Sequence, residues 1–347
     1  MSTKQGFAIG ELPKGARNAI TDVEGVHVGH VTLADGHIQT GVTAIRIGNE
    51  NPFHVRARAA VQVFNGFGKS AGLMQIEELG ELETPILLTN TLSVGAVTEG
   101  VVEYMCAKTQ EIGREAGTVN ACVFECNDGF INDIRGFHVR PHHVWEALAN
   151  AGPEFKQGAV GAGRGMSAFG LKGGIGSASR IVKVGKRDYT LGVMVLSNMG
   201  RLPDFIMAGK EMGDKLQPLV EEREHGPEKG SIIMIVGTDL PLSERQLKRV
   251  ARRTSVGLAR TGSFLGHGSG DIALAFTTSD PVRTQSRART MTVEQIDERR
   301  IDRVFRATAE ATEEAILNSM LYAETVSGRN NHTRYALSEL LSSLEGK

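Results

Sequence analysis

Short runs rich in valine and isoleucine recur along this chain of 347 residues, and Gly, Asn or Asp bounds them. Such runs predict β-strands, because β-branched side chains fit the pleated surface of a sheet and the bounding residues favour turns. The strands are predicted at 26–33, 42–47, 59–64, 86–89, 119–125, 190–197, 231–237 and 272–277. The sequence therefore predicts a protein in which β-sheet is a main component.

Helical patterns lie between these runs, but they do not alternate strictly with the strands. Residues 94–115 form one candidate helix, and a second follows Ser243, a residue type that caps helix N-termini. A third is predicted to follow Thr292, since Gln295 completes a capping box with it. Its apolar stripe is Ile301, Val304, Phe305, Thr308, Ala311 and Ala315. This order argues against a doubly wound fold and predicts a layered α/β or α+β fold with mainly antiparallel sheets.

Composition excludes several classes of protein. The formal net charge is −1 and glycine accounts for 42 residues, so we expect many tight turns or close backbone approaches and no general attraction to nucleic acid or anionic membranes. No apolar run approaches the ~18 residues of a membrane span, and the first residues, MSTKQGFAIGEL, lack the apolar stretch of a signal peptide. We expect Trp145 in the core and Cys106, Cys122 and Cys126 as buried thiols of a cytoplasmic protein.

A short motif, Gly68-Lys69-Ser70-Ala71-Gly72, matches the G-x-S-x-G nucleophile elbow of esterases. It follows a predicted strand and precedes a plausible helix, which is the context that an elbow requires. It also lies near the start of the chain, and no His and acid accompany it in the expected order. An esterase of the α/β-hydrolase type that uses Ser70 is therefore an alternative interpretation.

The segment 243–260 is strongly basic, which would suit a nucleic acid, but no aromatic residues interleave with its cations. We prefer a solvated helix face that pairs with acids of a neighbouring subunit. The glycine-rich segment 158–179 is either a close-packed turn or bulge region or, as we prefer, backbone that lines a substrate cleft.

Two histidine groups resemble metal sites only loosely, because no Cys or carboxylate stands near them at the spacing of metal ligands. Surface or hydrogen-bonded histidines are the preferred interpretation of both. The groups are the pair His27 and His30 and the cluster His138, His142 and His143.

The charged segment 221–230, EEREHGPEKG, is predicted to be an exposed loop, and it runs directly into the apolar strand that begins at Ser231. If the bond after Gly230 broke, Ser231 would gain a free α-amine beside its hydroxyl. Such an amine has a pKa of about 7.7–8, so it can act as a base near neutral pH. Nucleophile and base would then lie on one residue, as in N-terminal nucleophile hydrolases. Glycine before the bond permits the dihedral angles that an N→O acyl shift needs.

Several separate blocks, in the same order, resemble the DmpA family, which includes L-aminopeptidase/D-esterases and β-peptidyl aminopeptidases. The blocks are NAITDVEGVHVGHVTL (18–33), NGFGKSAGLMQIEELGELETPILLTNT (65–91), ECNDGFINDIRG (125–136), FGLKGGIGSASR (169–180), VLSNMG (195–200), GSIIMIVGTDLPL (230–242) and GSGDIALAF (268–276). The resemblance covers nearly the whole chain. It implies an Ntn-hydrolase-like four-layer αββα sandwich of the α+β class in a single catalytic domain, 1–347. It also implies autoproteolysis into 1–230 and 231–347, no metal, no cofactor, and a homo-oligomer that is commonly a tetramer.

The same resemblance implies a role for each matching residue. Ser231 would be the nucleophile, with its freed amine as the base, and Asn198 would stabilise the oxyanion. Ser269 and Asp271 match the pair that orients the terminus of the nucleophile. Lys172 matches a basic position near the site in relatives.

Two residues bear on the substrate. Glu125 would receive the α-ammonium of the substrate, because a carboxylate selects a free cationic amine. Asn127 stands where some relatives have a tyrosine, which makes the pocket smaller and more polar. The leading hypothesis is a self-processing serine-type aminopeptidase or amidase that forms an acyl-enzyme on Ser231 of a small L-peptide or amide, a D-ester or a β-peptide. The alternatives are the Ser70 esterase and a nucleic-acid-binding protein that uses the 243–260 helix.

Overall fold

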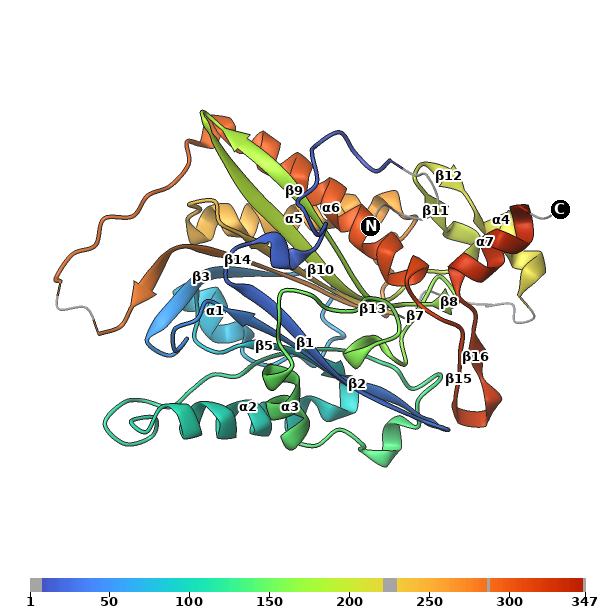
Figure 1. The fold of residues 1–347 in the computed structure, drawn as a ribbon, viewed down its shortest axis with the longest axis horizontal. Coiled ribbons are helices and arrows are strands. Elements are labelled where there is room, and N and C mark those ends of the chain that lie inside the picture. The colour runs from blue at the N-terminus through green and yellow to red at the C-terminus, as the bar shows by residue number, and fades with distance from the viewer. Residues whose placement is uncertain (1–7, 221–229, 286–287, 346–347) are drawn as a thin grey trace.

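The runs rich in valine and isoleucine form two β-sheets that pack face to face, with helices on the outer side of each sheet (Figure 1). This computed structural model describes residues 8–220, 230–285 and 288–345. The six-stranded sheet has the order β4 (Glu81–Leu82), β3 (Val55–Val63), β14 (Gly270–Arg283), β13 (Ser231–Thr238), β10 (Arg187–Asn198) and β9 (Gly174–Val184). The four-stranded sheet has the order β1 (Val26–Asp35), β2 (Ile38–Ile47), β5 (Ile86–Asn90) and β6 (Cys122–Cys126).

Helices complete the outer layers. α5 (Glu244–Arg260) and α6 (Asp302–Leu321) cover the six-stranded sheet, while α2 (Val94–Lys108) and α3 (His142–Ala149) cover the four-stranded sheet (Figure 1). β13–β14 and β5–β6 pair in parallel, and the other pairings described in these two sheets are antiparallel. The predicted αββα order of layers and the mainly antiparallel sheets are therefore confirmed.

Shorter elements lie at the edges of the sandwich. The helices among them are α1 (Leu73–Leu79), α4 (Gly213–Leu216) and α7 (Leu337–Glu345). The strands among them form three small pairs: β7 (Ser167–Ala168) with β8 (Leu171–Lys172), β11 (Ile206–Met207) with β12 (Lys210–Glu211), and β15 (Val326–Ser327) with β16 (Thr333–Arg334). No helix in the described ranges combines the length and apolarity that crossing a membrane requires.

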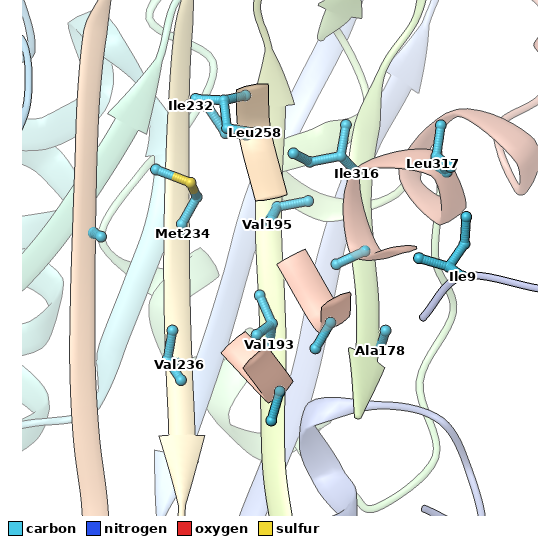
Figure 2. Packing of buried hydrophobic residues seen from close by; sticks show 14 of the residues in the cluster. Ile9, Ala178, Val193, Val195, Ile232, Met234, Val236, Leu258, Ile316 and Leu317 are labelled. Atoms are coloured by element: carbon cyan, nitrogen blue, oxygen red, sulfur yellow. The ribbon is translucent and has the colours of Figure 1, made fainter. Parts of the chain in front are cut away.

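The central strands contain continuous apolar runs, such as Ile232–Val236 of β13, because both of their faces are buried there. Side chains alternate between the faces of a strand, so β13 contributes to two cores at once. Ile232, Met234 and Val236 pack under α5 and α6, as Figure 2 shows. Ile233 and Ile235 point the other way, into the core between the two sheets. This double burial fixes the position of the strand that starts at Ser231.

The predicted helix starts were right in one case and wrong in another. Ser243 caps α5, and its hydroxyl accepts a hydrogen bond from the backbone N–H of Gln246. The capping box at Thr292 does not form, because residues 291–295 are exposed and have no apolar face to bury. α6 begins only at Asp302, where the predicted apolar stripe reaches the core.

Other expectations also need correction. The candidate helix 94–115 ends at Lys108. Cys122 and Cys126 are buried as predicted, whereas Cys106 is exposed on the outer side of α2. Trp145 is 37% exposed, and its ring packs edge-on against Tyr104 on the outer helical layer. Of the predicted loop 221–230, only Gly230 lies within the described residues.

The strand β9 was not predicted, because Gly, Ser and Ala occupy five of its first six positions, which weakens the pattern of a β-strand. Gly176 lies on the inner side of α6, where an added Cβ would come within 1.9 Å of the carbonyl oxygen of Ala315. Close approach of a strand to a helix thus explains this glycine, as in the close-packed alternative.

Four of the six basic residues of α5 form ion pairs with acids of the same chain, and the expected pairing with acids of a neighbouring subunit stays a prediction. The ion pairs are Arg245 and Arg249 with Glu298, Lys248 with Glu77, and Arg260 with Glu313. In addition, the Arg253 guanidinium lies 4.2 Å from the ring centroid of Phe305. A face on which most cations already have an acidic partner offers less attraction to phosphates, which disfavours the nucleic-acid alternative.

Candidate active site

Three strand ends meet at one edge of the six-stranded sheet. β13 begins at Ser231 and lies between β10 and β14. Ser231 pairs with Asn198, the last residue of antiparallel β10, and with Gly270, the first residue of parallel β14. The register therefore brings three chain segments that are distant in sequence to the same place. They are the segments that carry the predicted nucleophile, oxyanion donor and orienting pair.

The peptide bond between Gly230 and Ser231 has two donors on its carbonyl oxygen. The Ser231 hydroxyl donates to the Gly230 oxygen at 2.7 Å, and the backbone N–H of Gly270 donates to the same oxygen at 3.1 Å. The hydroxyl thus lies beside the carbonyl group that precedes it, and that carbonyl is polarised.

Close packing against β10 excludes a side chain at position 230. An added Cβ at Gly230 would lie 2.5 Å from the carbonyl oxygen of Asn198 and 2.6 Å from the Cα of Met199. Lack of space is therefore one reason for a glycine here, and the expected freedom of its dihedral angles stays a prediction.

The orienting pair forms a buried network. The Ser269 hydroxyl donates to Oδ1 of Asp271 at 2.7 Å, and the Asn65 amide donates to Oδ2 at 2.9 Å. The same amide also donates to the carbonyl oxygens of Leu265 and Gly266, at 2.9 and 3.1 Å. Asn65 thereby ties the carboxylate to the loop that precedes β14, which holds the Ser269 hydroxyl in place beside the start of β13.

Asn198 is held through both ends of its amide. Its Oδ1 accepts from the Ser167 backbone N–H at 2.8 Å, and its Nδ2 donates to the Asn127 carbonyl oxygen at 3.0 Å. An amide NH₂ has two protons, so the second proton can still be donated to another acceptor. The side chain is only 9% exposed, which favours a fixed orientation.

Glu125 lies on β6, at the end of the facing sheet. The carboxylate is 1% exposed and accepts from the Lys69 backbone N–H at 2.8 Å and from the Thr91 hydroxyl. Gly68 lies between this carboxylate and the start of β14: a Cβ added there would lie 3.6 Å from Oε1 of Glu125 and 3.9 Å from the Cα of Gly270. The acid is therefore close to the strand end that carries Ser231.

Asn127 and Lys172 differ in their availability to a substrate. Asn127 is exposed, and its Oδ1 accepts from the Gly129 backbone N–H at 2.9 Å. Lys172 is fully buried, and its ammonium donates to the carbonyl oxygens of Gly163, Met166 and Gly173 at 2.7–2.9 Å. Burial, followed by the charge of a nearby arginine, lowers the pKa of Lys172 well below its ordinary value. With its donors occupied, Lys172 holds the glycine-rich loop behind Asn198 and is a candidate positioning residue.

A buried acid that the sequence interpretation did not use, Asp128, lies next to these groups. Its Oδ1 accepts from the Asn132 amide at 3.0 Å. Burial raises the pKa of Asp128 from 3.8 to about 7, against the effect of that hydrogen bond. Between about pH 4 and pH 7 the unfolded chain therefore loses this proton while the folded chain keeps it, so folding becomes less favourable as the pH rises.

We accordingly expect the variant Asp128→Asn, which cannot titrate, to gain stability relative to the wild type as the pH rises from about 4 to about 7. The gain is on the order of 4 kcal/mol, because one pKa unit corresponds to about 1.4 kcal/mol. Thermal unfolding of both proteins across this range measures it as a widening difference in Tm that levels off above pH 7. A difference in Tm that is independent of pH would show that Asp128 is not protonated in the folded chain.

The elbow motif has another role. Ser70 lies between β3 and α1, and its enclosed hydroxyl has no hydrogen-bond partner among the described residues, a histidine included. Its neighbour Lys69 donates a backbone N–H to Glu125, and Gly68 packs on Gly270. The motif therefore forms a close-packed support for the carboxylate, and the Ser70 esterase is not favoured.

The structure does not bring the two histidine groups of the sequence together as metal sites. His30 is held by the Thr43 hydroxyl and the Lys156 carbonyl, and burial lowers its pKa to about 4. His142 and His143 pack ring on ring at 4.0 Å. Among the described residues, the group of side chains that could hold a metal ion consists of His37, Asp133 and His138.

Three contributors to the site were missed. Asn65 is followed by Gly66, and an Asn-Gly pair indicates a turn rather than a support for a carboxylate. Thr91 follows β5, whose position beside β6 is a matter of tertiary structure. The N–H of Gly270 is a backbone group, which leaves no signal of its own in a sequence.

These features are those expected of a serine hydrolase site on an Ntn-hydrolase fold, and the comparisons support that class of protein. The fold matches the L-aminopeptidase D-Ala-esterase/amidase of Ochrobactrum anthropi, described as a new variant of the Ntn-hydrolase fold, with a TM-score of 0.89, 34% identity, and 98% of this chain and 96% of that one covered. The PH0078 protein of Pyrococcus horikoshii OT3 matches with a TM-score of 0.93, 48% identity and 98% of both chains covered.

The sequence comparisons lead to the same family. The β-peptidyl aminopeptidase BapA of Sphingosinicella microcystinivorans is 36% identical over 342 residues, which cover 92% of this chain and 85% of that protein. The model of Peptidase family S58 matches residues 18–334. The chain belongs to Peptidase family S58 and is a hydrolase, which confirms the resemblance to the DmpA family.

Proposed function

We propose that this S58 peptidase is a self-processing aminopeptidase that cleaves its own chain into 1–230 and 231–347 and then uses Ser231 as its nucleophile. The observation that carries the proposal is the hydroxyl of Ser231, 2.7 Å from the carbonyl oxygen of Gly230. Intact-mass analysis of the purified protein tests it: the second fragment must begin with Ser-Ile-Ile.

In the processing step, the Ser231 oxygen attacks the carbonyl carbon of Gly230. A C–O bond forms, the C–N bond breaks, and the hydroxyl proton passes to the departing nitrogen, so that an ester and a free α-amine result. Water then hydrolyses the ester and releases the carboxylate of Gly230. The N–H of Gly270, which already donates to the Gly230 oxygen, is placed to stabilise the negative charge that develops there.

In the catalytic cycle, the new α-amine of Ser231 acts as the base. Its ordinary pKa of about 7.7–8 leaves part of it unprotonated at neutral pH, so it can take the hydroxyl proton as the oxygen attacks the substrate. Ser269 and Asp271 orient this amine, and the remaining amide proton of Asn198 stabilises the oxyanion. An acyl-enzyme forms, the leaving group departs with the proton, and water releases the acyl group.

The substrate is proposed to be a small peptide, amide or ester with a free N-terminal amine. Glu125 is nearly fully buried, so the charge it offers is poorly screened and favours a cationic group. The relatives are named as a β-peptidyl aminopeptidase and an L-aminopeptidase D-Ala-esterase/amidase, so the candidate substrates to assay are L-peptides or amides, D-esters and β-peptides. Exposed Asn127 would line the polar side of the pocket.

The substitution Glu125→Gln tests the recognition of the amine. We expect kcat/KM for aminoacyl p-nitroanilides to fall about 10- to 150-fold, because a hydrogen bond to a charged group contributes about 1.5–3 kcal/mol. The loss should appear mainly in KM. The control is the same substrate with its amine acetylated, for which the two proteins should be equally poor. An unchanged KM for the free amine would exclude Glu125 as the ammonium site.

We further propose a homotetramer, which the family resemblance supports. We also propose a location in the cytoplasm, because three cysteines form no even disulfide framework.

A further inference from the structure

Three side chains that could bind a metal ion converge at a place that the sequence patterns did not indicate. His37 lies in the turn between β1 and β2, while Asp133 and His138 belong to the segment between β6 and α3. One ligand atom from each residue lies within 4.8 Å of the other two. The two segments are far apart in sequence, and their meeting is a property of the fold.

The backbone holds these residues together. The N–H of Asp133 donates to the carbonyl oxygen of His37 at 2.9 Å, and the N–H of Gly136 donates to that of Asp133 at 3.0 Å. Phe137 then adopts φ = 50°, which turns the chain so that His138 folds back over Gly136. A Cβ added at Gly136 would lie 2.1 Å from Nε2 of His138, so the ring occupies space that only glycine leaves open.

The side chains do not satisfy one another in this arrangement. Nε2 of His138 is shielded from solvent and has no hydrogen-bond partner in the described part of the chain. Asp133 precedes a short 3-10 turn, but its carboxylate does not cap that turn. By contrast, both ring nitrogens of His30 have partners, as does Nδ1 of His332. A buried polar atom without a partner is costly, which calls for a ligand at this place.

We propose that His37, Asp133 and His138 form a binding site for a divalent first-row transition metal ion, represented by Zn²⁺. Two neutral imidazoles and one carboxylate are a ligand set that Zn²⁺ accepts, with water in the fourth position. Tetrahedral ligands about 2.0–2.2 Å from the ion lie about 3.4 Å from one another, so small side-chain rotations suffice to close the site. The single negative charge of the set also favours a cation.

The ion would fasten the 127–138 segment to the turn between β1 and β2. That segment begins at Asn127, whose carbonyl oxygen receives the amide of Asn198. It is also tied to β2 through Asn132, which accepts from the Gln39 backbone N–H at 3.0 Å. A metal ion at the far end of the segment therefore acts as a structural clamp, and it takes no part in the chemistry proposed for Ser231.

The test uses the full chain without an affinity tag, stripped of metal and then titrated with Zn²⁺. We expect one Zn²⁺ per chain, measured by elemental mass spectrometry after desalting, and a rise in Tm of several degrees. His37→Ala and Asp133→Asn should each weaken the affinity at least about 10-fold and abolish most of the rise in Tm. These two residues are exposed or half-buried, so both variants should fold even if His138→Ala does not.

His142→Ala is the matched control, because it removes an exposed histidine from the neighbouring pair on α3. It should bind Zn²⁺ like the wild type. The proposal is overturned if the wild type retains no Zn²⁺, or if the His142 variant loses the ion while the His37 and Asp133 variants keep it. The readouts are independent of peptidase activity, so the proposed function and this site can fail separately.

Discussion

Replacing Ser231 with alanine is expected to leave a single uncut chain of 37.3 kDa without peptidase activity. The substitution removes the only oxygen on this residue that can attack the Gly230 carbonyl, so neither the ester nor the free α-amine can form. Nucleophile and base are then lost together. We expect activity to fall by more than about 1,000-fold, as for other enzymes that lose a nucleophile.

Two measurements check this expectation on the same sample. Intact mass should give two fragments for the wild type and one for Ser231→Ala, and aminoacyl p-nitroanilides should be hydrolysed by the wild type alone. Ser70→Ala is the matched control, since Ser70 is the alternative nucleophile and should leave both cleavage and activity intact. A Ser231→Ala protein that still splits or still hydrolyses the substrate would falsify the assignment of the nucleophile.

The strands of the core could be predicted because burial of both faces leaves a continuous apolar run, as in β13. The same reasoning failed for β9, which begins with mostly small residues and has α6 packed close against Gly176. It also failed at Thr292, where a good capping pattern has no apolar face behind it. Local sequence patterns thus predicted an element where tertiary packing favoured the same structure. They failed where the structure depends on tertiary packing that the local sequence does not show.

The candidate site could likewise be predicted only in part: the family resemblance suggested the residues, but the sequence did not show how they come together. A serine after a glycine at the start of an apolar strand is common, and only the family resemblance gave Ser231 and Asn198 their roles. Their meeting at one sheet edge depends on strand register, which no local pattern specifies. The His37 site was missed for the same reason, because its ligands come from two segments that are distant in sequence.

Asn198→Ala is expected to lower kcat about 100- to 1,000-fold with little change in KM, because the loss of an oxyanion donor costs about 2.7–4 kcal/mol. The effect should fall on kcat, since the amide proton of Asn198 is proposed to meet charge that exists only in the transition state. Asn198→Asp should be at least as slow, because an ionised carboxylate cannot donate and would repel the oxyanion. The exposed amide of Asn49 provides a matched control, and Asn49→Ala should keep the wild-type kcat.

Self-cleavage has to be measured separately, because Asn198 also packs beside the bond that we propose is cut. The carbonyl oxygen of Asn198 would lie 2.5 Å from a Cβ at Gly230, but that oxygen belongs to the backbone and is retained in the variant. The polarising donor for the processing step is the N–H of Gly270, which is also retained. We therefore expect Asn198→Ala still to cut itself, and to turn over substrate at the reduced kcat once cut. If fully cut Asn198→Ala had a normal kcat, the oxyanion would have to be stabilised by other groups, with the backbone N–H of Gly270 as the first candidate.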